Sequence, residues 1–578
     1  MPKPAKPESA KPKPKTKTTT RSGLDSAIWS VCDILRRSNC AGALQYVPEL
    51  TWILFLRILD ETEEVEATNA KAVGADFRPS LTAPYRWRDW AAPEAEERKK
   101  MVESTSNAFY DFVNTKLIPH LKALKDKPNA TPRQKVMSEI MSSVDRTRVD
   151  TQRNLLDALD KIHEISLDTV DDTHVFALSQ IYEGLLLKMG EKGNDGGQFF
   201  TPREVIRAIV EAVAPKVGET VCDPCCGTGG FLAQAYEFMR GGLGENATGD
   251  QIDALKHKTF YGREKENLVY PIALANLVLH GIDEPHLWHG NTLTREEIYS
   301  GLYQNAPGQF DVIVTNPPFG GKEGEDAQTR FAFKSRATEV LFLQDVMETL
   351  KPGGRCAIVL PEGILFQTNQ DAFVKTKRRL LDTCDLWCVL SLPGGVFTAT
   401  GAGVKTNVLF FTKGKATEKI WYFDLSAVKV AKKTPFTRAQ LAEFFKLLPT
   451  RADSDLSWTI DIAGRRRKAK EEADALRATA NEPKSRLKKH QEALDQLKKA
   501  KAKPEEQEAT RQLITACERE IRDIDSKAQS IEDAAFDLKA VNPNAKTEED
   551  TRTPAELIDL IETKGREVQS LLAKLKQL

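Results

Sequence analysis

The sequence predicts an α/β domain with a Rossmann-like, mostly parallel sheet, flanked by helical regions on both sides. Between Phe199 and about Asp424, short β-branched runs alternate with helical stretches, a pattern typical of parallel sheets with crossover helices. A glycine-rich loop, "DPCCGTGG", follows the first of these runs and precedes a helix. Before Leu187 glycine is scarce, and apolar residues recur there at helical spacing.

Four segments are expected along the 578 residues. Residues 1–21 are rich in Lys and Pro, lack an apolar run and are predicted to be a disordered basic tail. Residues 22–190 should form a helical N-terminal domain. A glycine-rich connection then leads into the α/β domain, residues 191–461. Residues 462–578 should form a charged C-terminal helical region.

Seven runs in the α/β segment are predicted strands: "ETVCD", "TFYGRE", "FDVIVTN", "GRCAIVLP", "LWCVLSLP", "TNVLFFT" and "IWYFDL". In the N-terminal segment the most apolar window is "LTWILFLRIL", Leu50 to Leu59. It is far shorter than the roughly 20 residues of a membrane span, so it is predicted to be a core helix. We find no signal peptide and expect a cytoplasmic protein without membrane contact.

Composition excludes some classes of protein. Lys+Arg and Asp+Glu are both 83, so the net charge is zero, which argues against a chain that grips nucleic acid alone through a large basic field. The nine cysteines show no repeated CxxC spacing, so neither a metal site nor a disulfide framework is expected. The adjacent pair Cys225 and Cys226 is interpreted as small buried residues, because neighbouring thiols ligate one metal poorly.

The C-terminal segment predicts long paired helices. Leu513, Cys517, Ile521, Ile524, Ala528 and Ile531 form a heptad-like seam. A shorter leucine seam precedes Pro504, so a helical hairpin is expected. A last helix should begin at Pro554, with Thr553 as N-cap and Glu556 closing a capping box. A self-packed bundle and a surface for a partner's helices both remain open.

The glycine loop carries an acid that indicates its ligand. Asp223 stands at the predicted strand end, no lysine follows Gly230, and the P-loop pattern is therefore absent. An acid there suits a cationic ligand better than a phosphate. Glu264 follows the next predicted strand, where an acid can hold ribose hydroxyls. A nucleoside with positive charge and no phosphate is S-adenosylmethionine; a solvated surface acid is the alternative for Glu264.

The stretch "GQFFTPREV", Gly197 to Val205, comes just before this loop. Thr201, Pro202 and Glu204 are predicted to form a capping box that starts a helix. The two consecutive aromatic residues have no role in such a cap, and we expect them to wall the methionine end of the cofactor.

"NPPF", Asn316 to Phe319, ends a predicted strand with an amide, two prolines and an aromatic ring. The Asn316 side-chain oxygen and the Pro317 carbonyl can accept both N–H groups of an exocyclic amine. Phe319 can stack on an extruded base, a contact worth about 1–3 kcal/mol. A turn that merely ends a strand would need none of these residue types in this order.

Together "QFFTPR", "DPCCGTGGF", "GREKE" and "NPPF" resemble the gamma-type amino-methyltransferases, most of all the modification (M) subunits of type I restriction–modification systems. "LPGGVFTATGAGVKTNVLFF" and "DLKAVNPN" resemble further segments of that family, and the likeness covers most of the chain after residue 22. The resemblance implies an α/β methyltransferase sheet with a reversed strand, S-adenosylmethionine as donor and adenine N6 in DNA as acceptor.

Motif matching to the family assigns residues to the site. The base-holding, catalytic residues would be Asn316, Pro317, Pro318 and Phe319. The cofactor-binding residues would be Gln198, Phe199, Phe200, Thr201, Pro202, Arg203, Asp223, Gly227, Thr228, Gly229, Gly230, Glu264 and Asn291. Asn291, in "HGNTL", takes the place where the family has an acid or amide near the cofactor's adenine.

The resemblance also implies partners. In the family a separate specificity (S) subunit reads the DNA sequence, two M subunits join it, and a restriction (R) subunit can be added; the M subunit acts on an adenine flipped out of duplex DNA. This chain has no second α/β region for reading bases, and its heptad-like C-terminal helices fit a partner-binding role.

Two rival hypotheses remain at this point. The first is methylation of a protein glutamine or an RNA base, because NPP[YF] serves planar amides and amines in general. The second is a non-catalytic scaffold. A decayed enzyme should have lost Asp223, Asn316 or the loop glycines, and all of them are present.

Overall fold

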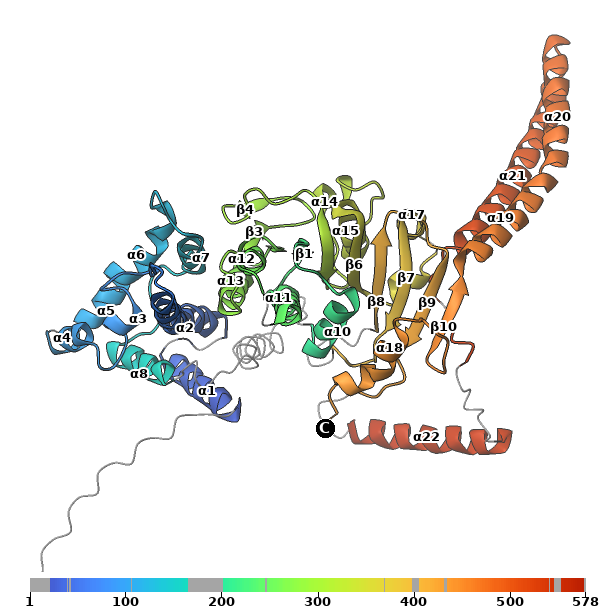
Figure 1. Cartoon of the computed structure of the whole chain (residues 1–578). Helices are drawn as coiled ribbons and strands as arrows, with labels where there is room; N and C mark the ends of the chain where they lie inside the picture. The colour runs from blue at the N-terminus through green and yellow to red at the C-terminus, as the bar shows by residue number, and fades with distance from the viewer. Residues whose placement is uncertain are drawn as a thin grey trace, which may run out of the picture.

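The computed structural model of the chain describes residues 21–38, 40, 43–104, 107–164, 201–244, 247–368, 370–397, 405–430, 434–539, 541–544 and 553–575. The predicted tail, apart from Arg21, and the glycine-rich connection lie outside these residues. A helical N-terminal part lies beside a central sheet domain, and a long helical hairpin projects from the other end of the sheet (Figure 1).

The N-terminal part is built from helices around an aromatic core. Its elements are α1 (Arg21–Arg37), α2 (Ala43–Ala72), α3 (Trp87–Trp90), α4 (Glu96–Ser104), α5 (Ala108–Phe112), η1 (Val113–Leu117), α6 (Ile118–Lys122), η2 (Ala123–Asp126), α7 (Pro132–Ile140) and α8 (Gln152–His163). The apolar window from Leu50 to Leu59 lies inside α2 and is buried along its whole length. It is a core helix, as predicted.

The central domain contains one ten-stranded sheet in the order β10-β9-β7-β8-β6-β5-β1-β2-β3-β4. The strands are β1 (Val221–Asp223), β2 (Phe260–Glu264), β3 (His286–Gly290), β4 (Glu297–Tyr299), β5 (Phe310–Thr315), β6 (Leu350–Pro361), β7 (Cys384–Ser391), β8 (Thr406–Lys413), β9 (Lys419–Asp424) and β10 (Ser457–Asp461). All seven predicted runs form strands. The sequence did not indicate β3, β4 and β10.

Strand directions confirm the predicted fold class. Parallel pairing joins β1 to β2 and β5, β2 to β3, β5 to β6, and β7 to β9. β8 runs antiparallel between β6 and β7, and it is the reversed strand expected from the sequence. β4 and β10 are also antiparallel to their neighbours, at the two edges of the sheet.

Helices cover both faces of the sheet. The helices of this domain are α10 (Arg203–Val213), α11 (Gly230–Leu243), α12 (Gly249–His257), α13 (Val269–Leu279), α14 (Glu325–Thr329), α15 (Thr338–Thr349), α16 (Gly363–Phe366), α17 (Asp371–Thr383), η6 (Arg438–Leu441) and α18 (Ala442–Leu447). α10, α11 and α13 share a core with Val312 and Val314 of β5, whereas α15 and α17 share the opposite core with Ile313. This alternation follows from the two-residue period of a strand.

α13 lies between the sheet domain and the N-terminal helices α2 and α7, and its residues from Val269 to Val278 are all buried. A helix that is apolar all round needs neighbours on every side. An ionic cluster closes the same interface. Arg133 of α7 donates to Glu66 of α2 at 2.8 Å and to Asp283, just after α13. Lys256 of α12 also donates to Asp283, at 3.2 Å.

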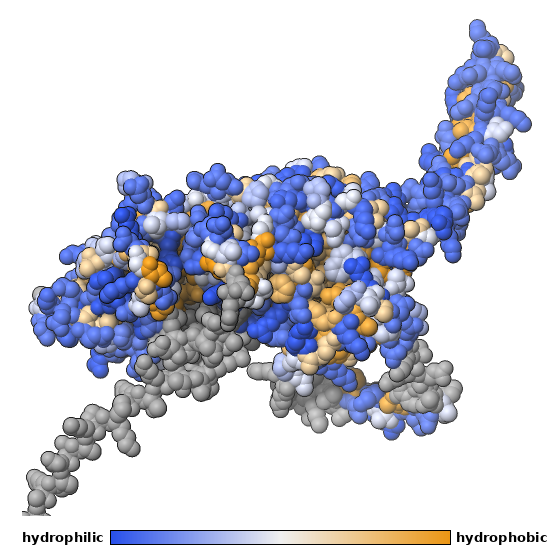
Figure 2. All heavy atoms as spheres, in the orientation of Figure 1, coloured by the Kyte–Doolittle hydropathy of each residue, from blue (hydrophilic) through white to orange (hydrophobic). Residues whose placement is uncertain are grey.

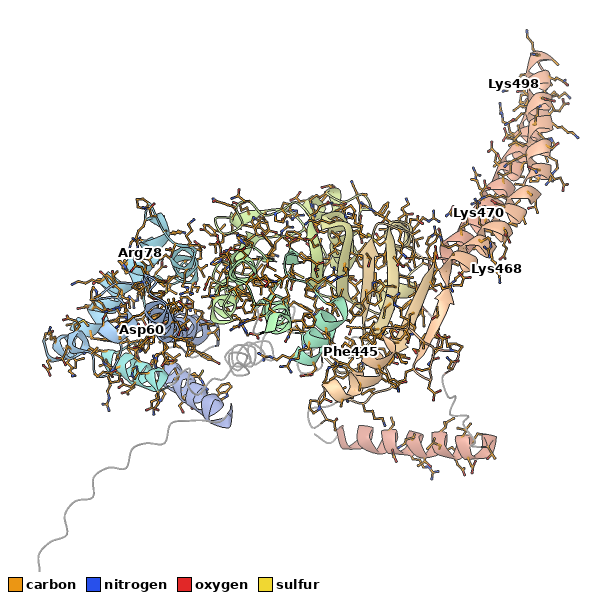
Figure 3. The ribbon with its side chains drawn as sticks, viewed as in Figure 1. Asp60, Arg78, Phe445, Lys468, Lys470 and Lys498 are labelled. Carbon is orange, nitrogen blue, oxygen red and sulfur yellow. The ribbon has the colours of Figure 1, made fainter. Side chains whose placement is uncertain are left out.

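The C-terminal helices are α19 (Ile462–Thr479), α20 (Asn481–Lys499), α21 (Pro504–Ala534) and α22 (Pro554–Leu575). α19 and α20 form one arm of the predicted hairpin and α21 the other, with Arg477–Glu532 at 2.6 Å and Arg486–Glu520 at 2.7 Å setting their register. The hairpin surface is mostly hydrophilic (Figure 2). Lys468, Lys470 and Lys498 lie along the first arm (Figure 3).

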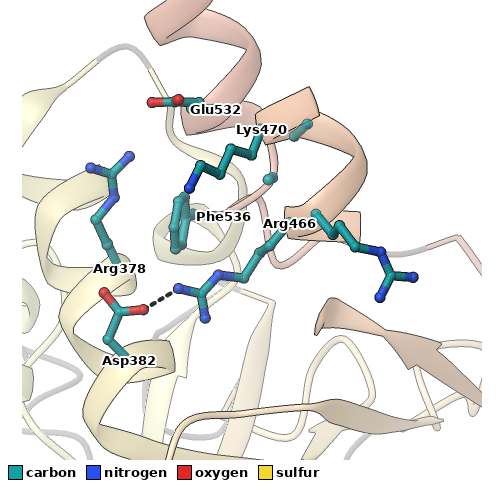
Figure 4. Close-up of a pocket in the computed structure, with 9 residues that line it drawn as sticks. Arg378, Asp382, Arg466, Lys470, Glu532 and Phe536 are labelled. Carbon is teal, nitrogen blue, oxygen red and sulfur yellow. Dashed lines mark hydrogen bonds and ion pairs between the residues drawn. The ribbon is translucent and has the colours of Figure 1, made fainter. Parts of the chain in front are cut away.

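The hairpin is rooted in the sheet domain by a cation–π sandwich. The ring of Phe536, just after α21, is contacted by the guanidinium of Arg378 at 4.6 Å and by that of Arg466 at 5.1 Å. Arg466 also pairs with Asp382, at the rim of a cavity of about 510 Å³ (Figure 4). Because Phe536 and Leu538 belong to the core under α17, the root is part of the domain rather than an appendage.

α22 begins as predicted. Glu556 accepts a hydrogen bond from the backbone N–H of Thr553 at 2.7 Å, and Thr553 Oγ1 accepts one from the N–H of Glu556. Ile558, Ile561 and Val568 of this helix are exposed. None of the helices in the described residues is long and apolar enough to cross a membrane.

Candidate active site

The candidate site lies where three neighbouring parallel strands end. Asp223 closes β1, Glu264 closes β2, and Asn316 follows β5 directly. The sheet order β5-β1-β2 places these strand ends side by side. Ligands of open α/β sheets bind outside the carboxyl ends of the strands, so the fold brings together the three motifs that are separated in the sequence.

The loop between β1 and α11 approaches its surroundings closely. Gly227 and Gly229 have φ of +54° and +81°, a conformation that favours glycine. A Cβ atom at Gly229 would also lie 3.1 Å from the Leu277 side chain. α11 starts at Gly230, so the positive end of its dipole faces the site.

Glu264 is held by the backbone of the glycine loop and of its own turn. Its Oε2 accepts from the N–H of Gly227 at 2.9 Å, and its Oε1 accepts from the N–H groups of Lys265 and Glu266 at 2.8 Å. Burial raises the pKa of Glu264 to about 7 despite these bonds. Three of roughly four acceptor positions are used, which leaves Oε2 able to accept one further donor.

Asp223 anchors the end of β5. Its Oδ1 accepts from Thr315 Oγ1 at 2.7 Å and from the N–H of Cys225 at 3.1 Å. Its side chain is buried, and burial raises its pKa to about 7. Thr315 immediately precedes Asn316, so this carboxyl group fixes the backbone from which the NPPF motif starts.

The Asn316 amide is oriented by a residue from another motif. Its Nδ2 donates to Thr201 Oγ1 at 2.9 Å. Its Oδ1 is buried and accepts no hydrogen bond from any residue that the structure describes. An unsatisfied buried acceptor is costly, so we expect a donor that the described residues do not supply.

Phe319 packs edge-on against Phe397, with ring centroids 5.9 Å apart. Pro317 is buried and Pro318 is exposed. The predicted shelf for a base is therefore half-buried beside the loop that follows β7.

Two cavities meet at Asn316. The larger, about 480 Å³, is lined by Glu264, Asn291 and the NPPF residues, and also by Gly227. This volume is in the range of small-molecule sites. The smaller, about 50 Å³, is lined by Thr201, Asp223, Thr228 and Gly230.

The orphaned Asn316 oxygen, the buried acids and the glycine loop fit a nucleoside-like donor beside an acceptor base. Among the described residues, no three or more His, Cys, Asp or Glu side chains lie close enough together to hold a metal ion.

Comparison with known proteins agrees with this geometry. The family described as N-6 DNA Methylase matches residues 173–471, and the family described as HsdM N-terminal domain matches residues 24–162. The first match spans more than half of the chain. The chain belongs to the N-6 DNA methylase family.

Similar proteins narrow the assignment within this family to the type I methylase subunits. The type I restriction enzyme EcoEI methylase subunit of Escherichia coli is 36% identical over 69% of this chain and 77% of its own length. The EcoKI methylase subunit of Escherichia coli K12 is 32% identical over 73% and 75%. A modification subunit from Vibrio vulnificus YJ016 has a TM-score of 0.67 at 30% identity and covers 79% of this chain and 94% of its own.

A solved structure concerned with assembly and conformational transition of the type I R-M system matches almost the whole chain. It covers 97% of this chain and 99% of its own, at 31% identity and a TM-score of 0.61. The protein is thus a type I methylase subunit and an adenine-specific DNA methyltransferase, and its donor is of the S-adenosylmethionine type. These relatives give no support to an RNA or protein acceptor or to a silent scaffold.

The methylase structure corrects one local prediction. α10 begins at Arg203 with Pro202 as N-cap, and no side chain caps it. Thr201 therefore does not form the predicted capping box with Glu204. The box fails because the hydroxyl of Thr201 is bonded to Asn316 instead of to the first turn of the helix.

The other predicted residues are placed as follows. Asn291 lines the larger cavity, and its Oδ1 accepts from the N–H of Leu293 at 3.0 Å, so this oxygen holds its own turn. Pro202, Arg203 and Gly229 line neither cavity. Gln198, Phe199 and Phe200 lie outside the described residues. Cys225 and Cys226 were both predicted to be buried. Cys226 is buried, whereas Cys225 is half-buried and lines both cavities.

Sequence reasoning missed one wall of the methylase site. Glu323, Thr338 and Phe342 line the larger cavity, and Thr338 Oγ1 donates to Glu323 Oε1 at 2.8 Å. They come from the loop after NPPF and from α15, where no motif distinguishes them. Their position depends on the bridge between Lys322 and Ala337, which holds the start of α15 against the loop after NPPF and which only the fold shows.

Proposed function

We propose that this methylase subunit transfers a methyl group from S-adenosylmethionine to N6 of an adenine flipped out of duplex DNA. A separate specificity subunit would choose the DNA site, and two methylase subunits would join it. The observation that carries the proposal is the buried Asn316 Oδ1, an acceptor without a donor among the described residues, at the junction of two cavities.

The residues present suit this reaction. Glu264 would accept a ribose hydroxyl at Oε2, and the carboxyl group of Asp223 would lie close to the cationic end of the donor. When bound, S-adenosylmethionine supplies a methyl group on a positively charged sulfur. Asn316 Oδ1 would accept one N–H of the adenine amine, and Phe319 would stack on the base. The methyl–sulfur bond breaks as the methyl–nitrogen bond forms, and the methylated nitrogen, now acidic, loses one proton to water. The chain's contribution is then mainly positioning, with no general base required.

The partner assignment follows from the same proposal. The hairpin uses part of its apolar seam internally, since Leu494, Cys517 and Ala528 are buried, whereas Leu513 is exposed. A specificity subunit would therefore meet its outer faces or the exposed apolar residues of α22. A restriction subunit could be added to the same assembly.

Asn316→Ala tests the proposal. The variant should bind S-adenosylmethionine with unchanged affinity by calorimetry, because the amide does not hold the cofactor. Its methyl transfer should fall by about 100-fold or more, the scale seen for loss of one preorganised hydrogen-bonding group. Activity is read as N6-methyladenine in digested DNA, with the specificity subunit present.

Asn129→Ala is the matched control, because Asn129 is exposed in the N-terminal part. It should leave methyl transfer unchanged. Methyl transfer by Asn316→Ala within tenfold of the unmodified protein would show that the amide oxygen is not the acceptor.

A further inference from the structure

The amide of Asn316 must face one way to work. An amide group has a donor end and an acceptor end, which exchange when the group turns over. Nδ2 donates to Thr201, whereas Oδ1, at the other end of the amide, is buried without a hydrogen bond from the described residues, and Asn316 lines both cavities. In the reverse orientation an N–H group of Asn316 would face an N–H group of the adenine amine, and the acceptor would be lost. Catalysis therefore needs something that selects one orientation.

Thr201 is the residue placed to select it. Its Oγ1 is 2.9 Å from Asn316 Nδ2 and accepts the amide proton, although the two residues are 115 positions apart. The hydroxyl is free for this purpose because Pro202, and not Thr201, is the N-cap of α10 and no side chain caps that helix.

The backbone on both sides of this bond is stiff. Thr201 precedes Pro202, and Asn316 precedes Pro317, so each partner has a restricted, extended backbone. Asn316 is held further by Thr315, which donates to the buried Asp223 at 2.7 Å. The restricted backbone at both residues limits the conformations in which the Thr201–Asn316 bond is lost, so the bond can act as an orientation lock.

We propose that Thr201 is a positioning residue whose hydroxyl holds the Asn316 amide with its oxygen towards the amine that is methylated. This inference rests on the proposed function of Asn316. It assigns to the Thr-Pro pair a role in orienting the catalytic amide, in addition to any contact with the cofactor.

Thr201→Val removes the hydroxyl and keeps the shape of the side chain. With the specificity subunit present and S-adenosylmethionine saturating, kcat for DNA methylation should fall at least tenfold. The cofactor Kd from calorimetry should stay within threefold. Thr201→Ser restores a hydroxyl and should return kcat to within threefold of the unmodified protein.

Testing Thr201→Val in a second variant, Asn316→Asp, separates loss of the amide orientation from general structural damage. Asn316→Asp has an acceptor at either end of the side chain, so no wrong orientation exists. Adding Thr201→Val to Asn316→Asp should lower the remaining kcat by less than threefold, in contrast to its effect beside the native asparagine. A loss of stability alone would affect both backgrounds equally.

Three results would overturn the lock. One is a kcat of Thr201→Val within twofold of the unmodified protein, and another is an equal loss in the Asn316→Asp background. The third is a cofactor Kd raised more than tenfold with kcat at saturation unchanged, which would make Thr201 a cofactor-binding residue only. The proposed function fails separately, through an active Asn316→Ala variant. If Thr201→Val does not fold, the same comparison is made with Thr201→Ala.

Discussion

At the scale of single residues, the two acids of the site act first on the protein's own backbone. Glu264 binds three N–H groups, and Asp223 binds Thr315 and the N–H of Cys225. Sequence reasoning treated both as ligands for a cofactor. The structure shows that each also shapes the loop or strand end that would receive it, so replacing either acid affects site geometry as well as binding.

The raised pKa of Glu264, about 7, predicts a pH dependence of cofactor binding. Burial disfavours the ionised form in the free protein, whereas a donating ribose hydroxyl favours it. A proton must therefore leave as the cofactor binds below pH 7, and the Kd should rise as pH falls, by up to about tenfold per pH unit for one coupled proton. Calorimetry at pH 6, 7 and 8 measures this.

Glu264→Gln is the control for that experiment. It should bind the cofactor more weakly at pH 8 and show a shallower pH dependence. The dependence should not vanish, because burial also raises the pKa of Asp223 to about 7. A Kd that is unchanged between pH 6 and 8 in the unmodified protein would contradict the prediction.

At the scale of elements, the contact of α7 with α13 joins the N-terminal helices to the sheet domain. Arg133 is only 13% exposed in its side chain and pairs with Glu66 and Asp283 from two different parts of the chain. Such a pair stabilises little relative to an apolar contact, but removing one partner leaves buried charge behind. The interface therefore depends on Arg133 more than on any single exposed ion pair.

Arg133→Met should destabilise this interface by about 1–3 kcal/mol, because Glu66 loses its partner while Asp283 keeps only Lys256. Hydrogen exchange of the α7 and α13 amides reads the local free energy of opening. Arg486→Met on the hairpin removes an ion pair whose two side chains are 47% and 49% exposed, and should cost about 1 kcal/mol or less. Equal effects of the two substitutions would refute the role given to Arg133.

At the scale of the whole molecule, the hairpin starts at the amino ends of the parallel strands, whereas the candidate site lies at their carboxyl ends. β10 runs antiparallel to β9 and ends at Asp461, opposite the strand ends that carry Asp223 and Glu264. α19 starts there and leads away from the site (Figure 1). α22 lies on the other side of the sheet domain, so the two C-terminal elements are candidates for separate contacts.

Replacing residues 486–520 by a short Gly-Ser turn should separate assembly from cofactor binding. The root, with Phe536 and Arg477–Glu532, is kept, so the thermal midpoint and the cofactor Kd should stay close to those of the full chain. Assembly with the specificity subunit on gel filtration should be lost, and DNA methylation with it. A second variant lacks residues 554–575, the helix α22. If the hairpin replacement assembles normally and this deletion does not, the contact with the specificity subunit belongs to α22.

Much of the fold could be predicted because short stretches of sequence determine the strands and helices concerned. Seven strands follow from β-branched runs, α2 follows from an apolar window, and the start of α22 follows from Thr553 and Glu556. The two edge strands, β4 and β10, were not predicted, because their own residues do not determine them. β4 has three residues and β10 five, and each is a strand mainly because a neighbouring strand pairs with it.

By itself the sequence determined the family, the α/β class and the motifs that end β1, β2 and β5, since residue type and local spacing encode these. Only the tertiary structure decided what the side chains do. Thr201 bonds Asn316 across 115 positions, and Arg133 reaches Asp283 across 150. Local propensity favoured a helix cap for Thr201, but the packed strand ends brought the Asn316 amide within its reach, and its hydroxyl accepts the amide N–H instead.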